Sequence, residues 1–250
     1  MSHPPRTGIN KRLFKLRFLP LYPMTVWLVL VAHTTELRLR IGVALALLGL
    51  AIRFWANGYV GDVKVNWTRS PGDAKVGRLV TAGPYAWVRH PLYLGSVLIG
   101  GGVCVIAGDI WVALTLLGFF LVVYRGKMSQ EEGLLRDEIG TPYLIYHGAV
   151  PRWWPSTRRY ANRQGAWRWD GIRASNEWKT VIWVVVLLIA LYFREEFIQE
   201  HEAMFPMVWE WRHTVLLGLM TSAMALDGLI ELKKRSAARA RVAAVRQPVT

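Results

Sequence analysis

The sequence predicts an all-α integral membrane protein, a bundle of about six transmembrane helices with a cofactor pocket on the cytoplasmic side. Of the 250 residues, 53% are hydrophobic and 13 are tryptophan. Apolar runs recur at roughly 20–34, 41–58, 93–107, 110–124, 178–193 and 213–230. Several are shorter than the about 20 residues that cross a bilayer untilted. Trp, Tyr and Arg at their ends extend such spans by anchoring at the membrane interface.

The charge distribution predicts the topology. The net charge is +14, and Lys and Arg gather in the two termini and in the loops 59–92 and 125–177, whereas the 195–212 loop is acidic. Because positive loops stay in the cytoplasm, we expect both termini and the active site on that side, at the inner membrane if the cell is bacterial. No basic groove or recognition motif indicates nucleic acid, so the bilayer is the expected partner.

The pattern divides the chain into three parts. Residues 1–40 are a basic leader with the first membrane helix, and 41–155 are the core. Residues 156–250 are an extension with an interfacial segment, two further helices and a basic tail. We expect Arg53 to snorkel from the second helix to the interface. Trp167 and Trp169 predict an amphipathic interfacial piece within 156–177.

A motif at the start of the third apolar run carries the strongest functional signal. It runs from Gly83 to Gly95 and contains Tyr85, Arg89, His90 and Pro91. Proline fits the first turn of a helix, because the amide that it lacks would be unpaired there, so we expect a helix to begin at this point.

A second polar cluster, Arg125, Lys127, Glu131 and Glu132, follows one hairpin later. If Gly108-Asp109 forms the tight turn, Pro91 lies opposite about residue 126 on the returning helix. Lys127 is then level with Pro91, and the two glutamates lie about one turn further out. The two clusters are therefore expected at the same mouth of the hairpin.

The residue types of these clusters match a zwitterionic, purine-bearing cofactor. A helix start with free amides suits a carboxylate. Glutamates attract an ammonium group or bind ribose, and tyrosines stack on a base. S-adenosylmethionine has all of these features. The sequence carries no metal-ligand spacing, nucleophile signature, P-loop or dinucleotide fingerprint.

The chain also resembles the isoprenylcysteine carboxyl methyltransferases and the related membrane phospholipid methyltransferases, over roughly 40–155. The resemblance rests on residues 78–85, 89–93 and 131–135, and on Ile139-Gly140, Tyr143, Tyr146 and Val150-Pro151. It implies S-adenosylmethionine as the cofactor and a lipophilic methyl acceptor. The cofactor-binding residues that it implies are Gly77, Arg78, Leu79, Val80, Tyr85, His90, Pro91, Leu92, Tyr93 and Glu131.

The resemblance leaves the acceptor open. The prenylcysteine enzymes hold the substrate carboxylate with an arginine four residues before the first glutamate, where this chain has Lys127. Lysine neutralises a carboxylate but lacks the guanidinium fork. Arg125, close by, is the other candidate for this role. A carboxylate or thiolate acceptor needs no general base, whereas an amine or hydroxyl needs one, which Glu132 or His90 could supply.

Two alternatives remain. Membrane sterol reductases share a similar Arg-His-Pro-x-Tyr motif and bind NADPH, but they typically have Asn before that tyrosine and Glu after the glycine, where this chain has Leu92 and Ser96. The other alternative is a non-catalytic membrane protein that retains the fold.

Overall fold

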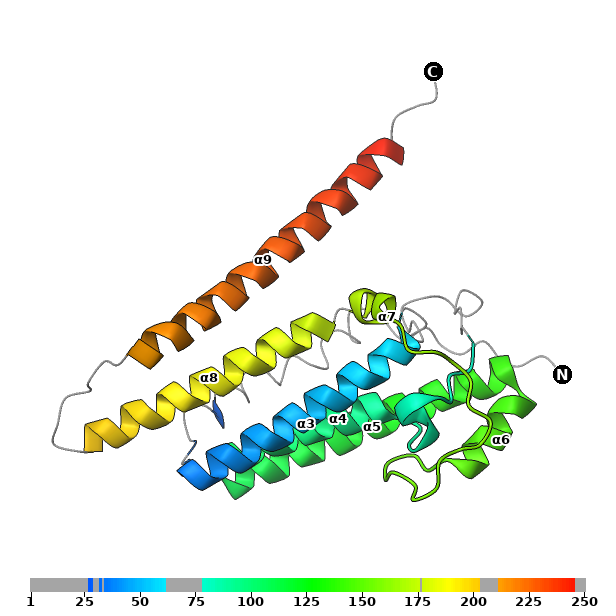
Figure 1. Cartoon of the computed structure of the whole chain (residues 1–250), viewed down its shortest axis with the longest axis horizontal. Helices are drawn as coiled ribbons and strands as arrows, with labels where there is room; N and C mark the ends of the chain where they lie inside the picture. The colour runs from blue at the N-terminus through cyan, green and yellow to red at the C-terminus, as the bar shows by residue number, and fades with distance from the viewer. Residues whose placement is uncertain are drawn as a thin grey trace. The chain divides into compact units, whose positions relative to one another are not determined.

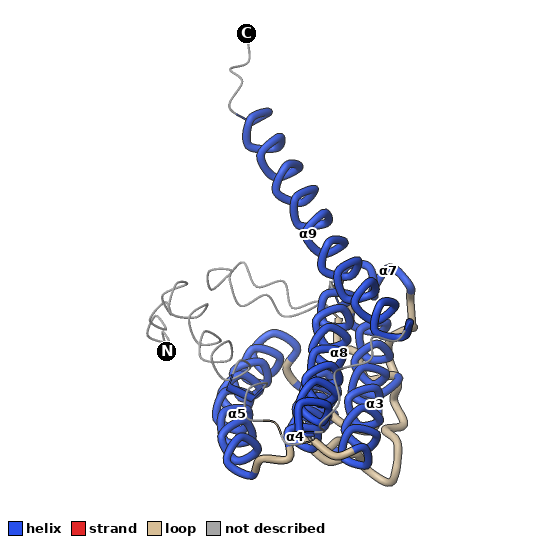
Figure 2. Tube along the Cα trace, turned by 90° about the vertical axis from the view of Figure 1, so that its left-hand side faces the viewer, coloured by secondary structure: helices blue, strands red, loops and turns tan. Residues whose placement is uncertain are grey.

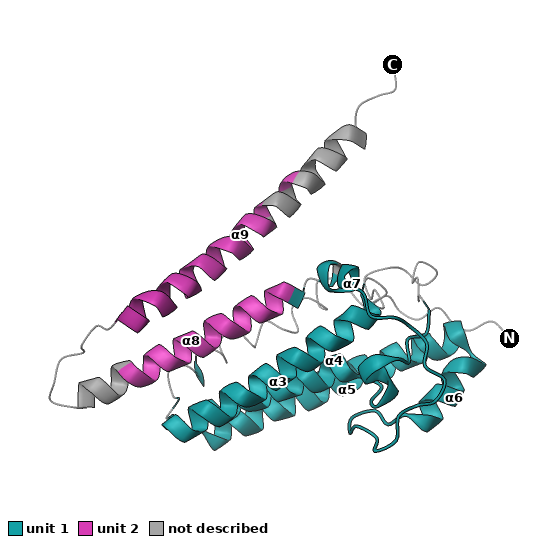
Figure 3. Cartoon of the chain, viewed as in Figure 1, with its two compact units in different colours: residues 1–177 teal, residues 178–250 magenta. Residues whose placement is uncertain are grey.

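The computed structural model describes residues 27–28, 32, 34–61, 78–175, 177–202 and 211–245, and all regular structure among them is helical (Figure 1). The elements in chain order are α3 (Glu36–Val60), the 3-10 helix η1 (Gly83–Ala86), α4 (Pro91–Ala107), α5 (Ile110–Ile139), α6 (Thr141–Ala149), α7 (Trp169–Ala174), α8 (Glu177–Glu202) and α9 (Trp211–Val245). Residues 1–177 and 178–250 form two compact units (Figure 3).

The helical membrane bundle predicted from the sequence is confirmed. Within the described residues, three helices are long and apolar enough to cross a membrane: Glu36–Val60, Ile110–Ile139 and Trp211–Ile230. The apolar α4 is shorter, at 17 residues. The apolar run of α8 between Lys179 and Arg194 has 14 residues, and α8 is not among the three. The first predicted helix, 20–34, lies almost wholly outside the described residues.

Helix α3 begins at Glu36, earlier than the apolar run at 41 indicates. The side chain of Thr35 caps this end by accepting from the backbone amide of Arg38. Capping satisfies one of the amide groups that the first turn leaves unpaired, so the helix extends into polar sequence.

Helix α4 lies between α3 and α5 in the first unit, and Figure 2 shows the three running side by side. Glycines bring α3 and α4 into backbone contact. A Cβ on Gly42 would lie 2.4 Å from the carbonyl oxygen of Gly102, and one on Gly49 would lie 2.5 Å from that of Gly95. Small residues permit this close approach between membrane helices. The α3–α4 pair is therefore packed backbone to backbone within the first unit.

The turn predicted at Gly108-Asp109 is confirmed. Gly108 ends α4 with a left-handed φ of 67°, which glycine adopts without steric cost. Asp109 begins α5 as its N-cap, and its side chain accepts from the Val112 amide at 2.9 Å. Helix α5 then runs 30 residues and carries both glutamates on its polar end.

We expect Asp109→Ala to lower the free energy of unfolding by about 1 kcal/mol, the usual cost of a lost N-cap. The measurement is thermal unfolding of the detergent-purified protein. Asp109→Asn keeps a capping oxygen and is the matched control. An equal loss in both variants would show that the negative charge, rather than the cap, stabilises this turn.

The second unit is a pair of helices with a polar contact at each end. Trp183 on α8 donates its indole N–H to Asp227 on α9 at 3.2 Å. Arg212 on α9 donates to Glu196 on α8 at 2.8 Å. Asp227 thus has a partner. These contacts join α8 and α9 near both ends of their apolar segments.

Candidate functional site

A cavity of about 300 Å³ lies where the polar ends of α3, α4 and α5 meet η1 and α6. Its walls come from separate parts of the chain. The lining residues are Arg53, Val60, Arg78, Leu79, Val80, Tyr85, Arg89, His90, Pro91, Leu92, Tyr93, Lys127, Glu131, Leu135, Tyr143 and Tyr146. Cavities of this size accommodate small organic ligands.

The Arg-His-Pro segment forms one wall. Helix α4 begins at Pro91, as the sequence predicts, and His90 is its N-cap residue. The His90 ring is buried, and its centroid lies 5.6 Å from that of Tyr93. The motif thus aligns an imidazole and a phenol along one side of the cavity.

Glu131 and Lys127 face this wall from α5. The Tyr93 hydroxyl donates to Glu131 Oε1 at 2.6 Å, and His90 Nδ1 lies 3.8 Å from Glu131 Oε2. Lys127 Nζ lies 5.3 Å from the centroid of the Tyr93 ring. The predicted alignment of the two clusters across the hairpin is therefore present.

Glu132 lies behind the wall, buried among cationic side chains. Arg89 Nη1 donates to Glu132 Oε1 at 2.8 Å, and Arg152 Nε donates to the same oxygen at 3.1 Å. Arg152 Nη2 donates to Oε2, and His90 Nε2 lies 3.0 Å from Oε1. This Glu132 cluster (Arg89, His90, Glu132 and Arg152) joins the start of α4, the end of α5 and the chain after α6.

The α6 tyrosines close another side of the cavity. Tyr143 and Tyr146 are buried on one face of the short helix, as their spacing predicts. The Tyr146 hydroxyl donates to the Tyr85 carbonyl at 2.8 Å, which ties α6 to η1. Burial raises the pKa of Tyr143 to about 12, and the charge of Glu132 adds to this rise. Both rings are therefore neutral near pH 7, and Tyr143 is available as a hydroxyl donor or an aromatic wall.

The prediction that Arg53 snorkels to the interface is wrong. Its guanidinium donates to Glu177 Oε2 at 3.1 Å, to the Leu92 carbonyl at 3.1 Å, and to the Ser96 hydroxyl. The Arg53 side chain is 17% exposed and lines the cavity. A buried carboxylate at the end of the first unit holds it inward, because each charge compensates the other.

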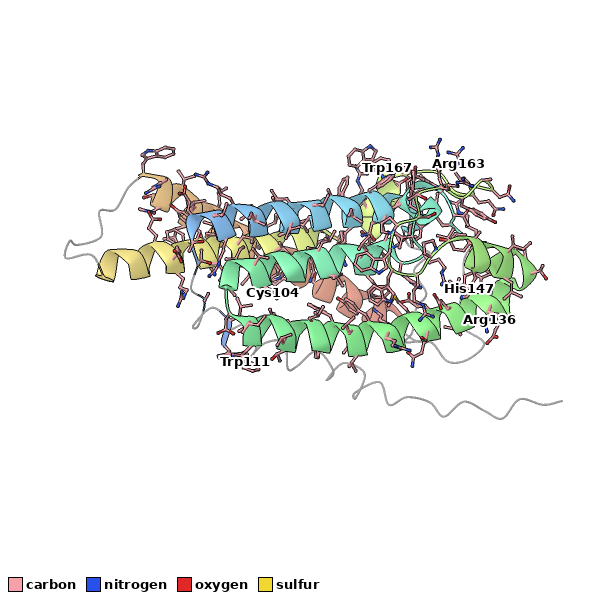
Figure 4. The ribbon with its side chains drawn as sticks, turned by 90° about the horizontal axis from the view of Figure 1, so that it is seen from below. Cys104, Trp111, Arg136, His147, Arg163 and Trp167 are labelled. Carbon is pink, nitrogen blue, oxygen red and sulfur yellow. The ribbon has the colours of Figure 1, made fainter. Side chains whose placement is uncertain are left out.

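Residues 156–168 form a loop against the cavity wall, followed by the short helix α7. Thr81 donates its hydroxyl to the Asn162 carbonyl at 2.8 Å, and the Gln164 carbonyl accepts from the Thr81 amide at 2.9 Å. Trp167 packs directly on Gly58 of α3. Figure 4 shows Trp167 and Arg163 at this end of the helices and Cys104 toward the other end of α4. The loop thus braces the segment that carries Leu79 and Val80.

The described cofactor-binding candidates all line the one cavity: Arg78, Leu79, Val80, Tyr85, His90, Pro91, Leu92, Tyr93 and Glu131. Gly77 lies outside the described residues. Among the three catalytic candidates only Lys127 lines the cavity, since Arg125 is exposed on α5 and Glu132 lies in its buried cluster.

The sequence analysis missed the roles of Arg53, Arg89 and Arg152 in this site. A signal exists for Arg89 alone, because it adjoins His90 in the motif. The partners of Arg53 and Arg152 lie 124 and 20 residues away in sequence. No local pattern indicates those pairings.

Residues 37–139 match the family model described as phospholipid methyltransferase. The matched segment contains α3 from its first turn, α4, and α5 to its end. Comparison of the chain with curated proteins and with solved structures gives no significant match. The segment 37–139, which forms the apolar helices beneath the cavity and most of its lining, is therefore similar to the phospholipid methyltransferases.

Proposed function

We propose that this protein transfers a methyl group from S-adenosylmethionine to a lipophilic acceptor. One observation carries the proposal: a single cavity collects residues from 78–93 with Glu131 and Lys127 of α5. The family resemblance assigns Glu131 and most of the lining residues from 78–93 to the cofactor, and it assigns the position of Lys127 to the substrate. These residues meet at the polar end of apolar helices. A water-soluble donor and a membrane-borne acceptor could both reach that place.

The charges and aromatic rings of the lining support this cofactor. Glu131 offers a carboxylate to an ammonium or to ribose hydroxyls, and Lys127 and Arg89 offer cations to a carboxylate. Tyr85, Tyr143 and Tyr146 offer aromatic surface to a purine and a sulfonium. When bound, S-adenosylmethionine supplies an electrophilic methyl group. The protein then contributes chiefly by positioning the acceptor, which is worth up to about 7–11 kcal/mol in such reactions.

His90 is the better candidate for a general base, where the acceptor needs one. It lines the cavity, whereas Glu132 lies behind it and is engaged by two guanidinium groups. Because a carboxylate only accepts, the contact of His90 Nε2 with Glu132 leaves Nδ1 of a neutral ring as the accepting atom. Glu132 then orients the ring. Lys127 is placed to neutralise an acidic acceptor, and Arg125 is too exposed to share that task.

We further propose that the cavity opens toward the cytoplasm. The basic segments that flank it favour that side by the positive-inside rule. The acceptor would then arrive laterally from the bilayer, and the donor from water.

Glu131→Gln is expected to weaken binding of S-adenosylhomocysteine by about 10–100-fold, the effect of losing a hydrogen bond to a charged group. The measurement is calorimetry on the detergent-purified protein, with NADPH titrated in parallel. Glu138→Gln, an exposed change on the same helix, is the control and keeps wild-type affinity.

The outcomes separate the candidate functions. Binding of S-adenosylhomocysteine that the Glu131 variant weakens supports the methyltransferase site and justifies screening lipid acceptors with a labelled methyl donor. Binding of NADPH alone would indicate a reductase. A well-folded protein that binds neither compound would instead be a non-catalytic member of the fold.

A further inference from the structure

The chain from the end of α5 to the start of α7 is rich in arginine. Residues 139–169 contain five arginines and no acidic residue. Arg152 donates to Glu132 on α5. Arg168 Nη2 lies 3.4 Å from Asp170 Oδ2, just beyond this stretch. The other three are exposed and lie in the loop 156–168, which we call the arginine loop: Arg158, Arg159 and Arg163. Three exposed positive charges are therefore grouped on one loop with no acidic residue among them.

The arginine loop is fixed to other parts of the first unit by backbone hydrogen bonds. At its start, the Ser156 amide donates to the Trp87 carbonyl at 2.8 Å. At its end, the Arg168 amide donates to the Gly58 carbonyl at 2.8 Å. The bonds with Thr81 described above hold its middle. The exposed arginines therefore project from a backbone that is held at both ends and between them.

The arginine loop is attached where a candidate membrane-spanning helix ends. Gly58 lies in the last turn of α3, and Glu36–Val60 is long and apolar enough to cross a membrane. Aromatic rings meet at the same level, since the Phe54 centroid lies 6.0 Å from that of Trp169 and both side chains are exposed. Figure 4 shows Arg163 at this end of the helices. Because exposed aromatic residues at the end of a span are typical of the membrane interface, the loop is level with the lipid headgroups.

We propose that the arginine loop binds the phosphate groups of anionic phospholipids in the membrane that the helices cross. Guanidinium groups form paired, charge-assisted hydrogen bonds with phosphate oxygens. Anionic lipids attract basic segments that lie close to the membrane surface, and the place of the loop beside a span favours lipid over a soluble polyanion. This surface is separate from the cavity, because Arg158, Arg159 and Arg163 do not line it.

The test removes the three charges and measures lipid selectivity. The detergent-purified protein is titrated with phosphatidylglycerol and with phosphatidylcholine of the same acyl chains, and native mass spectrometry counts the bound lipids. We expect the wild-type protein to retain phosphatidylglycerol over phosphatidylcholine by about fivefold or more, the effect of at least one basic side chain near an anionic surface. The variant Arg158→Gln/Arg159→Gln/Arg163→Gln is expected to lose this preference.

The matched control carries glutamine at three exposed arginines that each have an acidic residue within four positions of the sequence: Arg38, Arg40 and Arg136. It loses the same net charge and is expected to keep the lipid preference. Because all six side chains are exposed, both variants are expected to keep the wild-type thermal midpoint. Equal retention of the two lipids by the wild-type protein, an unchanged preference in the loop variant, or an equal loss in both variants would overturn the proposal. Binding of a short DNA duplex in place of phosphatidylglycerol would overturn it as well, and would assign the loop to nucleic acid.

Discussion

Glu132→Ala is expected to cost about 3–5 kcal/mol of folding free energy, the usual loss when one partner of a buried ion pair is removed. The carboxylate is 4% exposed and compensates Arg89, whose side chain is 10% exposed. Without it, the Arg89 charge stays buried with no counter-ion in contact. Arg89 and His90 also line the cavity, so the variant is expected to bind S-adenosylhomocysteine poorly as well.

Thermal unfolding and calorimetry of the purified protein measure the two effects. Glu138→Ala removes an exposed carboxylate from the same helix and is expected to change stability by less than about 0.5 kcal/mol. Glu132→Gln keeps the shape and one accepting oxygen, so its loss is expected to be smaller than that of Glu132→Ala. A Glu132→Ala protein as stable as the Glu138 control would show that water or rearrangement compensates the two arginines.

Gly102→Ala is expected to destabilise the α3–α4 pair by about 3 kcal/mol, the upper end for overpacking a core. The added Cβ would lie 2.4 Å from the Gly42 carbonyl oxygen and 2.9 Å from the Ala46 amide nitrogen. Both are backbone atoms of α3, so no side chain can move aside. The helices must separate, and the separation carries to the cavity that they support.

Gly101→Ala is the matched control, because its Cβ would meet nothing within 4 Å among the described residues. It adds the same methyl group one position earlier, and alanine favours the helix by up to about 1 kcal/mol. The thermal midpoints of the two variants are the measurement. A Gly102→Ala protein that melts with the Gly101 control would mean that α3 and α4 are not in backbone contact.

Much of this arrangement follows from local pattern. Pro91, Gly108 and Asp109 predict where α4 begins, where it ends and where α5 begins, because each has backbone or capping preferences that few other residues share. Counting residues back from the turn along two regular helices then places Lys127 and Glu131 opposite His90 and Tyr93. The observed bond between Tyr93 and Glu131 agrees with that alignment.

The partners of the buried charged residues could not be predicted from the local sequence pattern. Arg53 has the same pattern as an interfacial anchor, and its inward orientation depends on Glu177, at the far end of the first unit. Arg152 follows a Val-Pro step with nothing nearby to indicate Glu132 as its partner. Which residues pair across tens of positions depends on how the elements pack. The side-chain type alone indicates only that the partner carries the opposite charge.

By itself, the sequence determined the helical membrane class, the α4–α5 hairpin and the facing of its two polar clusters, because apolar run length, glycine and proline act locally. The tertiary structure alone decided that Glu132 lies behind the cavity while Glu131 lines it. Adjacent residues of a helix point about 100° apart, so which carboxylate faces the ligand depends on where α4 and α6 pack around α5.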